Sequence, residues 1–62
     1  MFYREITTGA HQWRIQQTGP DRYSVSLFEK MGGLWKLLGP SETWCWALVQ
    51  ELLDGQAEEV IQ

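Results

Sequence analysis

Alternation of apolar and polar side chains governs two neighbouring segments of this sequence. Residues 11–17 (HQWRIQQ) show it, and residues 22–31 (RYSVSLFEKM) repeat it around Tyr23, Val25 and Leu27. A period of two places successive side chains on opposite faces of an extended chain, which is typical of half-buried β-strands. We therefore expect two strands at these positions, joined by a turn at TGPD.

The pair Gly32-Gly33 predicts a tight hairpin between the second strand and a third at about 34–38. Both central positions of a type I′ turn have positive φ, which glycine adopts without steric penalty. Such a two-residue turn also determines the register of the strands. This turn places Phe28 opposite Leu37 and Glu29 opposite Lys36. We expect an ion pair between Glu29 and Lys36.

A helix is predicted at about 41–54, after the strands. Pro40 favours the entrance of a helix, and Ser41 is the expected N-cap. Gly55 is the expected left-handed residue that ends the helix. The remaining tail, 55–62, is compatible with a second helical turn or with a frayed end.

The apolar arc of this helix is wide, about half of its circumference. Leu48 and Leu52 lie at its centre, so we expect both to be buried against the sheet. Cys45 falls in the same arc and is expected to be a buried, structural thiol. Trp46 lies at an edge, where either a terminal segment or a partner covers it.

These elements predict an α+β fold: a three-stranded antiparallel meander, followed by one C-terminal helix packed on one sheet face. Residues 2–7 can add a fourth strand, and the whole chain, 1–62, is expected to form a single small domain. An odd loop between the first two strands gathers the apolar side chains on the face under the helix. That face is expected to carry Trp13, Ile15, Tyr23, Val25, Leu27, Met31, Leu34 and Leu38.

Composition excludes several classes of protein. One cysteine and one histidine cannot provide an internal disulfide or the three to four ligands of a zinc site, so we expect no metal and no cofactor. His11 has no Ser or Asp partner at a recognisable spacing, and we expect no enzymatic activity. No apolar stretch is long enough to cross a membrane and no leader-like segment opens the chain, so a cytoplasmic location is expected.

Charge is unevenly distributed along the chain. The formal net charge is -3, but all five basic residues precede Gly39, and five of the eight acidic residues follow Pro40. The first part is therefore +2 and the second -5, which makes the chain electrically two-sided.

Protein–protein association is the leading functional hypothesis. The chain is then a non-catalytic module that forms a homodimer, or a small acidic inhibitor or adaptor of a larger protein, for instance one that binds nucleic acid. The expected contact residues are Phe28, Trp35, Leu37, Trp46, Glu51 and Asp54. The alternative is a nucleic-acid platform on the exposed sheet face, because aromatic rings stack on bases and basic groups contact phosphates. Its expected contact residues are Arg14, Gln16, Lys30 and Trp35.

Overall fold

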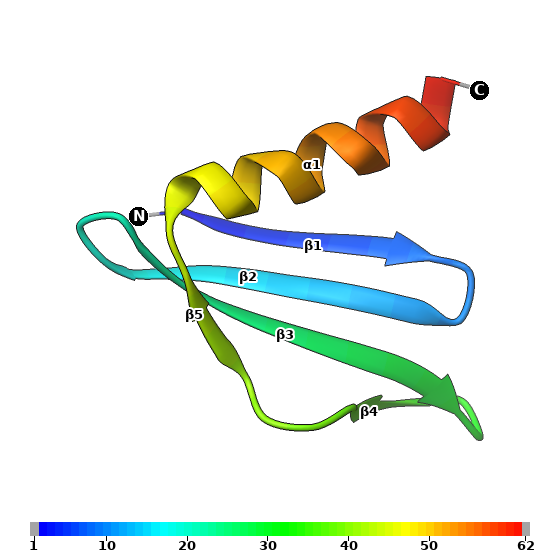
Figure 1. Ribbon diagram of the computed structural model, residues 1–62. Coiled ribbons are helices and arrows are strands. Elements are labelled where there is room, and N and C mark those ends of the chain that lie inside the picture. Colours follow the sequence, from blue (N-terminus) through cyan, green and yellow to red (C-terminus); the bar gives the residue numbers. More distant parts are fainter. Residues whose placement is uncertain (1, 62) are drawn as a thin grey trace.

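The computed structural model describes residues 2–61, with the side chains of residues 2–55. The chain forms an antiparallel sheet followed by one helix, which confirms the predicted α+β meander (Figure 1). The elements in chain order are β1 (Tyr3–Thr8), β2 (His11–Gly19), β3 (Arg22–Met31), β4 (Leu34–Leu37), β5 (Glu42–Trp44) and α1 (Trp46–Ile61).

The strands follow the order β1-β2-β3-β4, and β5 also pairs with β3. Because β2 occupies one edge of β3, β4 and β5 lie one after the other along its second edge (Figure 1). The strand predicted from residues 2–7 is confirmed as β1, which turns back through Gly9 at a φ of 60°. The β2–β3 register opposes Trp13 to Leu27 and Ile15 to Val25, so the predicted sharing of one face is confirmed.

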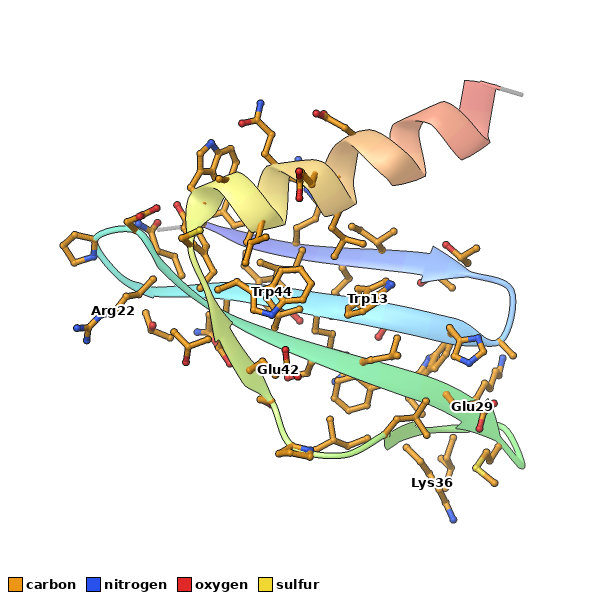
Figure 2. The ribbon with its side chains drawn as sticks, in the orientation of Figure 1. Trp13, Arg22, Glu29, Lys36, Glu42 and Trp44 are labelled. Atoms are coloured by element: carbon orange, nitrogen blue, oxygen red, sulfur yellow. The ribbon has the colours of Figure 1, made fainter. Side chains whose placement is uncertain are left out.

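The hairpin between β3 and β4 has the predicted turn and register. Gly32 and Gly33 have φ values of 61° and 81°, as a type I′ turn requires. The opposed pairs are Phe28 with Leu37 and Glu29 with Lys36. The predicted ion pair is nevertheless wrong: the Lys36 side chain points away from Glu29 (Figure 2), and the Glu29 carboxylate lies 3.5 Å from His11 Nε2. Lys36 is exposed at the sheet edge, where water solvates its ammonium group.

The predicted start of the helix is wrong, because residues 42–44 form β5. This segment pairs with the first apolar–polar positions of β3, Tyr23 to Val25. The Ser41 hydroxyl does not cap a helix; its Oγ lies 2.5 Å from that of Ser26 on β3. Backbone groups of β3 would otherwise lack partners along this edge, and pairing satisfies them. Residues 42–44 therefore form a strand, although Pro40 and Ser41 favour the start of a helix.

The helix begins at Trp46, where the β2–β3 turn provides its cap. The backbone N–H of Trp46 donates to Asp21 Oδ1 over 2.8 Å, and the N–H of Val49 donates to the carbonyl oxygen of Cys45 over 3.2 Å. Asp21 has a φ of 52°, a left-handed conformation that Asp and Asn tolerate better than other L-residues. The expected end of the helix at Gly55 is also wrong, since α1 continues to Ile61. The expected tail thus belongs to α1 up to residue 61, and residue 62 lies outside the described residues.

The core lies between α1 and the helix-facing side of the sheet. Its buried residues are Ile15, Tyr23, Val25 and Val49. Partly buried residues surround them: Phe2, Ile6, Trp13, Trp44, Leu52 and Leu53. The helix therefore faces the sheet through Val49, and the expected burial of Leu48 is wrong, since this residue is 47% exposed. Leu52, which was expected at the centre of the buried arc, is only half-buried. The buried stripe of α1 is therefore shifted by about one residue from the predicted stripe. The reason is that Trp44 joins the sheet and Asp21 determines where the helix begins.

Within the described residues, no helix is both long and apolar enough to span a membrane. Cys45 is free and exposed, so its expected burial is wrong as well. It precedes the first helical residue and lies on the connection from β5, at the margin of the helix–sheet interface.

Candidate functional site

The polar face of the sheet, which points away from α1, is held together by internal contacts. The Arg14 guanidinium carbon lies 4.1 Å from the centre of the Phe28 ring, and Arg14 Nε donates to Gln12 Oε1 over 2.7 Å. Gln12 in turn donates from Nε2 to Thr7 Oγ1 over 3.0 Å and is 7% exposed. Phe28 is therefore half-buried beneath Arg14, although the strand alternation predicted it as an exposed anchor.

The other predicted residues of the polar face are more accessible. Lys30 Nζ lies 5.9 Å from the centre of the half-buried Trp35 ring, and Leu37 is 50% exposed. Gln16 is exposed and opposes Tyr3 across the β1–β2 pair. The structure thus brings Lys30, Trp35 and Leu37 together on the β3–β4 hairpin and leaves Gln16 at the far end of the sheet.

Tyr3 and Glu5 form a short contact on the same face. The Tyr3 hydroxyl donates to Glu5 Oε2 over 2.6 Å, and this hydrogen bond is the main cause that raises the pKa of Tyr3 above its ordinary value. Burial and the negative charge of Glu5 act in the same direction, while Arg14 opposes them. The contact keeps the phenol protonated, which favours it as a donor.

The predicted helix residues have different surroundings. Trp46 is 37% exposed, and its ring packs on Phe2 at 5.7 Å and on Tyr23 at 5.5 Å between centroids. The N-terminal segment therefore covers part of Trp46, one of the two outcomes that the sequence allowed. Glu51 and Asp54 are exposed on α1. They are separated from Trp35 and Leu37, which belong to the opposite side of the sheet.

The helix leaves part of its own side of the sheet uncovered. Three large side chains on that side remain accessible at the β3–β4 hairpin and just beyond it: Met31 is 49% exposed, Leu34 68% and Leu38 43%. We call these residues, with Leu27, the open apolar face. The opposed charged residues Glu29 and Lys36 lie on the same side, between Met31 and Leu34 at one end and Leu27 and Leu38 at the other. Strand alternation assigned the four apolar residues to the core face. The exposure of the three large side chains shows that α1 does not cover this end of the sheet, which alternation alone did not predict.

A hollow of about 160 Å³ lies at the boundary between the core and the open apolar face. We call it the Trp–Glu hollow; it is lined by Trp13, Val25, Leu27, Leu38, Pro40, Glu42 and Trp44. The rings of Trp13 and Trp44 lie 6.0 Å apart at 50° to each other. Trp44 Nε1 donates to Glu42 Oε1 over 3.0 Å, and Figure 2 shows the Trp13 and Trp44 side chains next to each other.

This hollow was not predicted from the sequence. Glu42 and Trp44 were assigned to the first turns of a helix, and β5 instead aligns them with Val25 and Tyr23. Their spacing of two was the available signal, because a period of two puts both side chains on one face of a strand.

Among the described residues, no group of three or more His, Cys, Asp or Glu side chains could hold a metal ion. The exposed His11, at the start of β2, contacts the half-buried Glu29.

Comparison of the chain with protein-family models, curated proteins and solved structures gives no match.

Proposed function

We propose that this chain is a non-catalytic protein-binding module whose contact surface is the open apolar face. The observation that carries the proposal is the exposure of Met31, Leu34 and Leu38 on the side of the sheet that also holds the core. Burying such large side chains is the main driving force of protein association. Exposed apolar side chains interspersed with polar and charged groups are typical of a protein interaction site.

The partner in this proposal is a second copy of the chain or a larger protein with a basic surface. The segment after Pro40 has a charge of -5, and Glu51 and Asp54 are exposed on α1. Complementary potentials accelerate encounter and select the partner. In its sharper form, the chain is a small acidic inhibitor or adaptor. A cytoplasmic setting belongs to the same proposal, because the free, exposed thiol of Cys45 suits a reducing compartment.

The polar face supports the proposal less strongly than expected. Trp35 and Leu37 can still contribute to binding, whereas the Phe28 ring is covered by Arg14. The nucleic-acid alternative is weakened by the same contact, since the Arg14 guanidinium is already engaged by Phe28 and Gln12. A phosphate would have to compete for it. Lys30 remains the more accessible basic group on this face.

Photo-crosslinking in the cells that produce the protein tests the proposal. A benzophenone amino acid replaces Leu38 on the open apolar face, and the matched control replaces Ala47, which is exposed on α1. We expect a protein adduct from position 38 and none from position 47. An adduct of twice the chain mass indicates a second copy, and any other protein adduct indicates a foreign partner. Absence of a protein adduct at position 38, or an adduct that nuclease removes, would refute the proposal.

A further inference from the structure

We infer that the Trp–Glu hollow binds one cationic side chain, a lysine or an arginine, of the partner polypeptide. The inference rests on the proposed function, because it names the chemistry of the partner at the edge of the same surface. Its basis is the combination of two indole rings, one carboxylate and an apolar rim in a hollow of suitable size.

The size of the hollow fits one compact group. Its volume is about 160 Å³, and an apolar cavity of about 150 Å³ is large enough to hold benzene. An ammonium group with its last methylenes, a methylated ammonium group or a guanidinium group is of comparable size. Leu38 and Pro40 also line the hollow, and the aliphatic stem of a lysine or arginine side chain can lie against them.

The charge of the hollow favours a cation over a neutral apolar group. Glu42 brings a carboxylate to an otherwise apolar lining, and its hydrogen bond from Trp44 Nε1 holds it there. Among the described residues, the ion pair of the sheet joins His11 to Glu29 and does not involve Glu42. Lys36, on the same side of the sheet, points away from the hollow (Figure 2). The exposed Glu42 carboxylate thus has no internal cationic partner among the described residues and can attract a cation that approaches from outside.

The aromatic walls favour a cation for a second reason. A cation is attracted to the face of an aromatic ring within about 6 Å, and tryptophan is the strongest partner. Other rings of this chain already have an internal cation: Phe28 has Arg14 at 4.1 Å, Trp35 has Lys30 at 5.9 Å, and Phe2 has Arg4 at 5.9 Å. Within the described residues, no such contact is found for Trp13 or Trp44. In the described part of the chain, the two tryptophans beside the carboxylate thus lack the internal cation that these three other rings have.

Titration of the full chain with short capped peptides tests this inference. The peptides are acetyl-Gly-Xaa-Gly-amide, where Xaa is lysine, trimethyllysine, arginine or the neutral norleucine. The indole N–H signals in ¹H–¹⁵N spectra report the site, because Trp13 and Trp44 line the hollow while Trp35 and Trp46 serve as internal controls. We expect the cationic peptides to shift the first two signals and to bind at least about fivefold more tightly than the norleucine peptide.

Two matched variants assign the effect to the carboxylate. Glu42→Gln keeps an oxygen that accepts the Trp44 hydrogen bond but removes the charge, and it should weaken the cationic peptides about two- to fivefold. Glu51→Gln removes one negative charge from the exposed side of α1 and should leave their affinity unchanged. The spectra of both variants verify that the fold is retained.

Several results would overturn the inference. Equal binding of the norleucine peptide would mean that the hollow is merely apolar, and equal losses in the two variants would mean that only net charge matters. Absence of any shift at Trp13 and Trp44 with every peptide would also refute it. None of these results contradicts the proposed protein-binding function, which the crosslinking at Leu38 tests separately.

Discussion

Asp21 is expected to contribute more to stability than any other charged side chain on a turn of this protein. Its carboxylate accepts the Trp46 N–H over 2.8 Å, and the first turn of α1 contains no acidic residue of its own. Loss of a helix-capping acceptor costs about 1 kcal/mol, and loss of the negative charge at the exposed helix N-terminus costs about 0.3–1 kcal/mol more. Alanine must in addition adopt the φ of 52° of Asp21, which costs about 1 kcal/mol.

Three substitutions separate these contributions. Asp21→Asn keeps an acceptor and tolerates positive φ, so it should lower the free energy of unfolding by about 0.5 kcal/mol. Asp21→Gly loses the acceptor and the charge without backbone strain, for a loss of about 1–2 kcal/mol. Asp21→Ala adds the strain and should lose about 2–3 kcal/mol. For a domain of this size each kcal/mol corresponds to about 4–8 °C in Tm.

Thermal and urea unfolding, followed by circular dichroism and tryptophan fluorescence, measure these differences. The order of stability should be parent, Asn, Gly, Ala. A glycine variant as stable as the parent would show that the bond to Trp46 contributes nothing. Equal stability of the glycine and alanine variants would show that positive φ at this turn is not a strain. The first result would refute the assignment of Asp21 as the cap of α1, and the second would refute the backbone contribution at this position.

The core, the hairpin and the polar face each carry a further prediction. Val49→Ala should cost about 2–3 kcal/mol, because Val49 is fully buried, whereas Leu48→Ala should cost less than about 1 kcal/mol; the reverse order in urea unfolding would mean that α1 packs by another face. Gly33→Ala should cost about 1 kcal/mol or more at its φ of 81°, and a thermal melt equal to that of the parent would contradict the type I′ turn. Glu5→Ala should lower the pKa of Tyr3 towards its ordinary value, measured by ¹³C NMR of the ring. Because the pKa of Tyr3 is raised in the folded state, the contact stabilises the fold below the ordinary pKa, and this stabilisation is lost as pH rises through the raised value; an unchanged pKa would show that Glu5 is not its cause.

Periodicity and turn chemistry were sufficient to predict most of the sheet. The alternation in β2 and β3 depends only on which side chains prefer burial, and positive φ at Gly32 and Gly33 depends only on the absence of a side chain. Both are local properties. For that reason the strands, the β3–β4 register and the residues that share the core face were accessible from the sequence.

The segment around Pro40 could not be predicted in this way. Its local signals favour a helix from Ser41, but the free edge of β3 offers hydrogen bonds that only the folded sheet makes available. Gly55 similarly permits the end of a helix without requiring one, and nothing lies within 4 Å of the place that a side chain would occupy there.

The candidate sites illustrate the same limit. Sequence patterns placed Arg14 and Phe28 on one face, but not the 4.1 Å contact that covers the ring. Trp13 and Trp44 are far apart in sequence, and only the pairing of β5 with β3 brings their rings to 6.0 Å. Local chemistry therefore determined the strands and turns of this protein. The start and phase of the helix, the uncovered part of the sheet and the Trp–Glu hollow were decided by tertiary structure, because backbone pairing and burial depend on segments that the chain joins only when it folds.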